Sequence, residues 1–168
     1  MTKTEQSAYR FQEMHEEHVA VLDKLTQLTQ AIGAPRTAQD STLPRYRDLL
    51  RALIDDLEGL VEDHFRFEER YLFPLLREAG KRALADSLAL EHIALRHAAL
   101  PVLDHVRKAL AASPSEKDWD EFKRQATVLI ELKRAHVRRE ETELVPVLKA
   151  VMAVDKARFP LRHPQAAL

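Results

Sequence analysis

The chain has 168 residues, of which 45% are hydrophobic and 32% charged, with a formal net charge of −1 and no cysteine. Such a balance is typical of one globular domain, and the missing cysteine excludes disulfides, thiolate nucleophiles, cysteine zinc sites and iron–sulfur clusters. The near-zero net charge argues against nucleic-acid binding. No apolar run approaches the roughly 20 residues that a membrane-spanning helix needs. We therefore expect a cytoplasmic protein that binds neither nucleic acid nor a membrane.

Helical periodicity covers most of the chain, and its breaks divide it into four predicted helices. The first spans about 4–32 and stops at Gly33, after which the polar, proline-bearing residues 34–42 form the one substantial loop. The second spans about 43–79, and the third about 81–112. The fourth begins at Ser113-Pro114-Ser115-Glu116, a capping box with proline at the first helical position.

Four long helices with mostly short connections predict an all-α protein, an up-down-up-down four-helix bundle over residues 1–153. Residues 154–168 are predicted to form a C-terminal tail. Three prolines fall inside the helical patterns, where a bend or an early end is expected: Pro74, Pro101 and Pro146. At about 100° per residue, the apolar faces of the second and fourth helices include Leu72, Leu75, Leu132, Leu144 and Val147.

Two histidine–glutamate pairs, His64/Glu68 and His136/Glu140, interrupt these apolar faces. A spacing of four residues places both members of a pair on one face of a helix. A carboxylate buried among apolar side chains costs several kcal/mol unless something neutralises it. One such pair is explained by a hydrogen bond on a solvated helix face, but two pairs inside apolar faces favour a buried site.

The pairs belong to an internal repeat of a two-helix hairpin. A histidine, two consecutive glutamates and a proline recur at identical offsets: His64, Glu68, Glu69 and Pro74, then His136, Glu140, Glu141 and Pro146. The preceding helices also repeat, because Glu17-His18 matches Glu91-His92. Folded as pseudo-twofold halves, the copies would bring four imidazoles and two carboxylates together, namely His18, His64, Glu68, His92, His136 and Glu140. Such a set suits two divalent transition metals, such as iron, zinc or copper, with carboxylates able to bridge them.

With the doubled His-x-x-x-Glu-Glu motif and its proline, the sequence resembles the hemerythrin-like (HHE cation-binding) domain family over roughly residues 11–152. The resemblance implies a four-helix bundle that holds two iron ions, with His64, Glu68, His136 and Glu140 as ligands and both glutamates bridging. Zinc is a possible substitute for iron. Hemerythrins proper carry a second histidine four residues after the first on the third helix, where this chain has Arg96, so reversible oxygen carriage is not expected.

The remaining histidines leave alternatives open. His18 lies near the centre of its predicted face and His15 toward the edge, so we expect His18 as the ligand and His15 as an additional ligand or hydrogen-bond partner. His97 is predicted to point away, at the surface or in an interface. We expect no role at the site for His105 and His163.

Two glutamates and two tyrosines lie near the predicted site. Glu69 and Glu141 are predicted either to face outward or to accept the second ring N–H of a ligand histidine. Tyr46 and Tyr71 are within reach of the centre, but filling the core is the expected role of both.

Three functions follow from this sequence. The first is a di-iron protein that binds or processes oxygen, nitric oxide or peroxide, with possible weak peroxide-consuming or oxidase-like activity. The second is an iron-responsive regulatory or iron-handling module without turnover, whose folding depends on metal. The third is an apolar bundle whose buried histidines only form hydrogen bonds. The sequence does not predict the oligomeric state.

Overall fold

The computed structural model describes residues 3–33, 44–55 and 61–158, and all regular structure in these ranges is helical. This confirms the predicted all-α class. The α-helices are α1 (Lys3–Gly33), α2 (Pro44–Asp55), α3 (Val61–Phe67), α4 (Phe73–Glu78), α5 (Arg82–Ala111), α6 (Glu116–Arg139) and α7 (Val145–Arg158). Two π-helical segments, η3 (Glu68–Leu72) and η4 (Glu140–Leu144), join α3 to α4 and α6 to α7.

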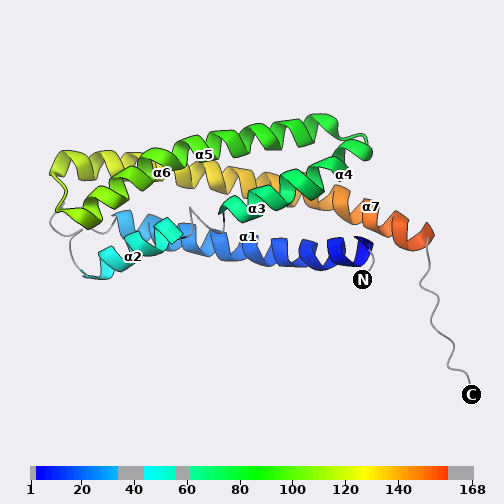
Figure 1. Cartoon of the computed structure of the whole chain (residues 1–168), viewed down its shortest axis with the longest axis horizontal. Helices are drawn as coiled ribbons and strands as arrows, with labels where there is room; N and C mark the ends of the chain where they lie inside the picture. The colour runs from blue at the N-terminus through cyan, green and yellow to red at the C-terminus, as the bar shows by residue number, and fades with distance from the viewer. Residues whose placement is uncertain (1–2, 34–43, 56–60, 159–168) are drawn as a thin grey trace, which may run out of the picture.

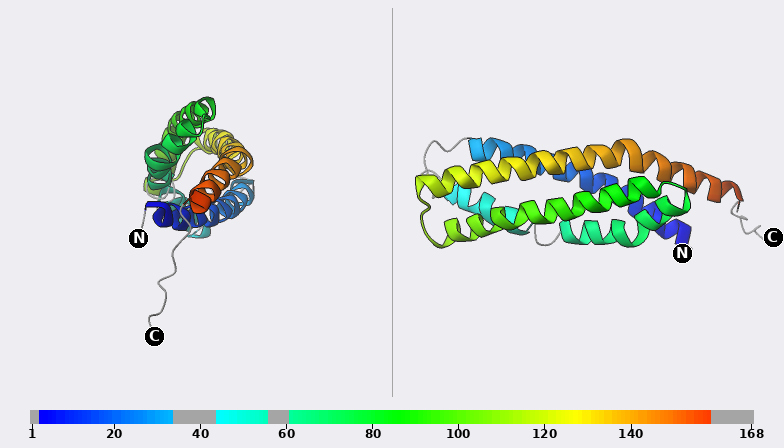
Figure 2. Two further views of the ribbon diagram at one scale, coloured as in Figure 1. Left: turned by 90° about the vertical axis from the view of Figure 1, so that its right-hand side faces the viewer. Right: turned by 90° about the horizontal axis from the view of Figure 1, so that it is seen from above.

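The long helices lie lengthwise beside one another (Figure 1). Helix α5 packs along α6, α1 also contacts α6, and α2 lies against α5. The views in Figure 2 show α1, α5 and the rod formed by α6, η4 and α7 running along the same long axis. None of the described helices is long and apolar enough to cross a membrane.

The ends of the helices follow from local chemistry. Helix α1 is described as far as Gly33, the residue at which its end is predicted, and the predicted loop at 34–42 lies outside the described residues. Beyond α4, Gly80 has a φ of 76°, a conformation that side chains with a Cβ rarely adopt. This turn lets the Lys81 N–H donate to the Leu76 carbonyl at 2.8 Å, so α5 begins almost at once.

The capping box of α6 is formed two residues later than predicted. Ser115 is the N-cap, its hydroxyl accepts a hydrogen bond from the Asp118 N–H, and the Asp118 carboxylate accepts one from the Ser115 N–H. The predicted box with Ser113 as the cap and Pro114 at the first position is therefore wrong. Ser115 and Asp118 offer the same spacing two residues further on.

The π segments stand directly before the repeated prolines. In η3 the Phe73 N–H donates to the Glu68 carbonyl, and in η4 the Val145 N–H donates to the Glu140 carbonyl, so each bond spans five residues instead of four. A proline lacks an N–H and its ring clashes with the carbonyl four residues earlier in an α-helix. The wider turn relieves both problems next to Pro74 and Pro146.

One extra residue per turn moves the buried face by one position after each π segment. After η3, Leu76 is fully buried and Leu75 only partly. After η4, Leu148 is buried and Val147 only partly. The predicted burial of Leu75 and Val147 is thus only partial, because a count of 100° per residue fails beyond a π turn. At Pro101, by contrast, α5 continues without ending.

Two apolar clusters occupy the interior. The larger cluster includes Phe65, Leu95, Val102 and Ile130. The smaller cluster consists of Leu72, Phe73, Leu76, Ala85, Leu88, Leu144, Val145 and Leu148. On α5, His92 lies between Leu88 of the smaller cluster and Leu95 of the larger, so the predicted site lies between two apolar regions.

Two predictions fall partly outside the described residues. The second predicted helix, 43–79, includes residues 56–60, which are not described, so its continuity stays a prediction. Helix α7 extends to Arg158, five residues past the predicted end of the bundle at 153. Residues 159–168 are not described, and the division into a bundle and a tail also stays a prediction.

Candidate metal centre

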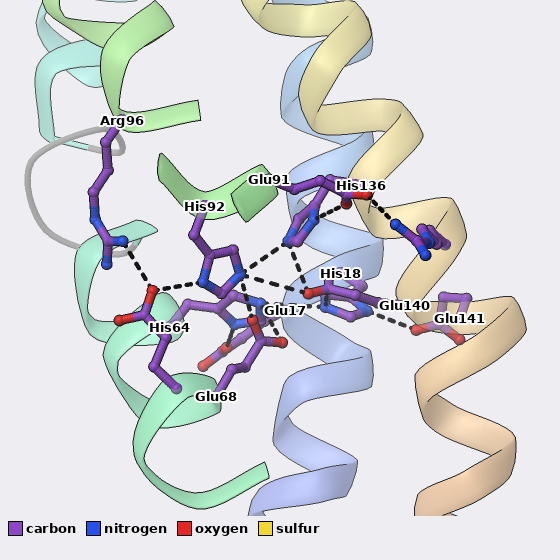
Figure 3. A network of polar contacts seen from close by, with 12 residues as sticks. Glu17, His18, His64, Glu68, Glu91, His92, Arg96, His136, Glu140 and Glu141 are labelled. Carbon is purple, nitrogen blue, oxygen red and sulfur yellow. Dashed lines mark hydrogen bonds and ion pairs between the residues drawn. The ribbon is translucent and has the colours of Figure 1, made fainter. Parts of the chain in front are cut away.

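All six predicted ligand residues come together in the interior (Figure 3). They are His18 from α1, His64 from α3, Glu68 at the start of η3, His92 from α5, His136 from α6 and Glu140 at the start of η4. None is more than 8% exposed. Their ligand atoms form two groups, each within 4.8 Å: His18, His64, Glu68 and Glu140; then His92, His136, Glu68 and Glu140.

The two glutamates belong to both groups. In the first group, His64 Nε2 lies 3.2 Å from Glu68 Oε1 and His18 Nε2 lies 3.1 Å from Glu140 Oε2. The second group uses the other oxygens: His92 Nε2 is 3.1 Å from Glu68 Oε2, and His136 Nε2 is 2.8 Å from Glu140 Oε1. Each carboxylate therefore presents one oxygen to each group, which is the arrangement of a bridging ligand.

These donor atoms fit cations. None of the four oxygens of Glu68 and Glu140 makes a hydrogen bond of ordinary geometry, although all four are buried. The Nε2 atoms of the two histidines in each group also lie only 3.2 Å apart. Lone pairs converging in this way are costly without a positive partner. Imidazole nitrogens with carboxylate oxygens are the donors that divalent transition metals accept.

Each histidine of the centre is held by a further carboxylate at its other ring nitrogen. The Nδ1–carboxylate distances are 2.7 to 2.8 Å, in the pairs His18–Glu141, His64–Glu17, His92–Glu69 and His136–Glu91. Because a carboxylate accepts the Nδ1 hydrogen, the Nε2 lone pair is left facing the centre. The ring orientation and the tautomer that metal binding needs are thus already set.

The repeat explains which carboxylates do this. Glu17 and Glu91 directly precede His18 and His92, and each contacts the next site histidine along the chain, His64 or His136 (Figure 3). Glu69 and Glu141 follow Glu68 and Glu140, and they contact His92 and His18. The sequence predicted one of two positions for Glu69 and Glu141, and the structure shows the hydrogen-bonded one.

Arg96 stands where hemerythrins proper carry a histidine, and its guanidinium points to the outer carboxylates. It donates a hydrogen bond to Glu69 Oε1 at 2.8 Å, and the same oxygen is 2.8 Å from His92 Nδ1. Arg139 also donates to an outer carboxylate, that of Glu91, although it is not the counterpart of Arg96 in the repeat. Arg96 therefore supports His92 through Glu69.

Opposite charges in the metal-free centre offset part of the cost of burial. Burial would lower the pKa of His64, but Glu17 and Glu68 raise it to about 9. Burial would raise the pKa of Glu140, yet the imidazoles of His136 and His18 hold it well below its ordinary value. The Glu140 carboxylate thus stays charged at neutral pH, and an entering cation displaces the proton that His64 holds in the metal-free protein.

The other candidate residues lie elsewhere or are not described. His97 is exposed, as predicted, and His105 is only partly buried. The side chain of His15 and all of His163 lie outside the described residues. Tyr71 is 49% exposed, so its predicted place in the core is wrong. Its ring lies against Phe67, with ring centroids 5.4 Å apart.

Tyr46 is buried, and its hydroxyl is 3.3 Å from the guanidinium of Arg45, so it fills the core as predicted. Sequence reasoning missed Glu17 and Glu91 as partners of the site. Their signal was present, because each is the residue repeated directly before a predicted ligand histidine.

The protein is thus all-helical, and its buried cluster of four histidines and two glutamates has the donor atoms of a cation-binding site. The family model of the hemerythrin HHE cation-binding domain matches residues 9–148. The chain therefore belongs to that family, as the doubled motif predicted. No match was found among curated proteins or solved structures.

Glu17 offers a test of the outer carboxylates. In Glu17→Gln the His64 Nδ1 hydrogen loses a charged acceptor at 2.7 Å, so metal affinity is expected to fall roughly 10- to 100-fold. Competition with a chelator measures this affinity for Fe²⁺ or Zn²⁺. Glu78→Gln, a change of an exposed glutamate, is the matched control. Wild-type affinity in Glu17→Gln would mean that Glu17 does not support the site.

Proposed function

We propose that this chain is a non-haem di-iron protein that binds or processes a small molecule such as oxygen, nitric oxide or peroxide. His18 and His64 would hold one iron ion, His92 and His136 the other, and Glu68 and Glu140 would bridge them. The observation that carries the proposal is that each buried glutamate offers one oxygen to each pair of histidines. Family membership, with its cation-binding domain, supports the same assignment.

We further propose an up-down-up-down four-helix bundle for this centre. Its second leg would combine α2 with α3, η3 and α4, and its fourth would combine α6, η4 and α7. The matched contacts of the two halves support this pseudo-twofold arrangement, since the four Nδ1–carboxylate contacts form two matching pairs.

Six protein ligands would leave coordination positions open on two metal ions, and bound iron would add redox chemistry, which zinc in the same donor set would not. The side chains of the protein orient and shield the centre. The four outer carboxylates fix the imidazole rings. The apolar clusters on both sides shield the centre, and ligand side chains at most 8% exposed would keep large substrates away from it.

The alternative is an iron-responsive regulatory or iron-handling module without turnover. The buried carboxylates without hydrogen bonds support it, because a fold that buries such groups is stabilised by metal and can report its presence. The two candidates differ in turnover. The first binds or processes a small molecule at its iron ions, whereas the second binds iron, stores it or signals its presence, and turns nothing over.

The metal content of protein purified without oxygen tests the proposal, together with absorption spectra before and after oxygen is added. We expect two iron ions per chain and a spectral change on oxidation. Bound zinc that iron does not displace would contradict the di-iron assignment. A protein that takes up no metal on reconstitution would contradict both candidates and favour a bundle with hydrogen-bonded histidines.

A further inference from the structure

Lys133 is a lysine buried next to the centre. It lies on α6, three residues before His136, and is 5% exposed. Its Nζ atom is buried and makes no hydrogen bond with any residue in the described part of the chain. Taking an ammonium group out of water without a partner costs several kcal/mol. A lysine kept in this position is therefore expensive unless something accepts its hydrogen bonds.

The amine lies over an aromatic ring that packs against the centre. Its Nζ lies 4.5 Å from the centroid of the Phe65 ring, which stacks on the His92 ring with centroids 3.8 Å apart. Burial lowers the pKa of the Lys133 ammonium, while the charges of Glu140, Glu68 and Glu17 oppose that shift. The cation–π contact with the Phe65 ring offsets only part of the free-energy cost of burying the ammonium.

Metal ions make the position of the lysine less favourable. Two divalent cations outweigh the charges of Glu68 and Glu140, which attract the ammonium in the metal-free centre, so metal binding weakens that attraction. An anion beside the metals would be attracted by the cations and would accept the hydrogen bonds that Lys133 cannot make with the protein. One ligand thus serves both the metal ions and the unpaired donor.

We propose that Lys133 donates a hydrogen bond to a small inorganic anion bound at the metal centre, and that it thereby makes the centre prefer anionic to neutral ligands. This inference rests on the proposed function, because it takes two metal ions to be held beside the lysine. Such small inorganic anions include azide, which serves as the probe in the test below, and the conjugate base of hydrogen peroxide. Lys133 is then a residue that determines which small molecule binds.

The test compares wild type, Lys133→Met and Lys123→Met after loading with iron. Lys123 is the control because it lies on the same helix but forms an ion pair with Asp120 at the surface. Iron content is measured first. The ferric proteins are then titrated with sodium azide and the ferrous proteins with nitric oxide, a neutral ligand, and both are followed by absorption. Azide affinity is expected to fall roughly 10- to 100-fold in Lys133→Met alone, with nitric oxide affinity unchanged.

The outcomes separate this inference from the proposed function. Wild type that binds no metal contradicts the proposed function itself. Normal iron content with wild-type azide affinity in Lys133→Met overturns the role of Lys133. An equal loss for azide and nitric oxide also overturns it, because the change would then act on the packing of the site. If Lys133→Met does not fold, Lys133→Gln removes the charge with a polar side chain and is judged by the same ratio of affinities.

Discussion

In Glu140→Gln, metal binding is expected to be lost at both positions of the centre, whereas His18→Asn should weaken only one. Glu140 Oε2 faces the first group and Oε1 the second, so a neutral amide removes a negative ligand from both ions. Loss of a partner that only supports a ligand costs roughly 10- to 100-fold in affinity, and loss of a shared ligand is expected to exceed about 100-fold. Metal content after dialysis against a fixed free metal concentration measures the stoichiometry.

Glu131→Gln is the control for this pair of variants. Glu131 lies on α6 but is 68% exposed and pairs with Arg134 at the surface, so its replacement should leave two ions bound. If Glu140→Gln retained one ion at wild-type affinity, Glu140 would serve one group alone and the bridging role would be wrong.

The convergence of the six site residues could be predicted because the relevant part of each helix is regular. His136 lies within α6, and the backbone at Glu140 is still right-handed helical with its N–H bonded to the His136 carbonyl. A histidine and a glutamate four residues apart therefore share one face, as in the sequence count. Charged groups inside an apolar face are unusual, and their repetition points to a common centre.

The count of 100° per residue fails where the helix is not a regular α-helix. Beyond η3 and η4 the helix is wider, so Leu76 and Leu148 are buried where Leu75 and Val147 were predicted. Pro74 and Pro146 were recognised as sites of disturbance, but whether a helix bends, ends or widens at proline depends on packing around it. Only the folded chain decides between these responses.

The prediction of buried residues also fails where residue type misleads. Leu132 was predicted in the core but is 40% exposed, while the neighbouring Lys133 is buried. Hydrophobicity favours leucine inside and lysine outside, so no pattern rule predicts the reverse. The carboxylates of Glu17 and Glu91 lie beside the predicted faces of their helices, and their partners are histidines of other helices. Such contacts follow from tertiary packing and not from periodicity.

Removal of metal is expected to lower the melting temperature by about 15–30 °C. A ligand that binds only the folded state at a thousandfold excess over its dissociation constant stabilises by about 4 kcal/mol per site, and each kcal/mol shifts the melting temperature of a chain this long by about 2–4 °C. The physical source lies in Glu68 and Glu140, which are fully buried without hydrogen bonds. Thermal unfolding of iron-loaded and chelator-treated protein, followed by circular dichroism, measures the difference.

The double variant Glu68→Gln with Glu140→Gln shows whether the stabilisation comes from this centre. Without the two shared carboxylates both groups lose their negative ligands, so the variant should melt at the same temperature with and without metal. A metal-dependent shift of wild-type size in the double variant would place the stabilising ions elsewhere on the protein. Equal melting temperatures for loaded and stripped wild type would mean that the buried carboxylates are already neutralised by the imidazoles of His64 and His136. The fold would then not depend on metal, and a metal-responsive module would lose its physical basis.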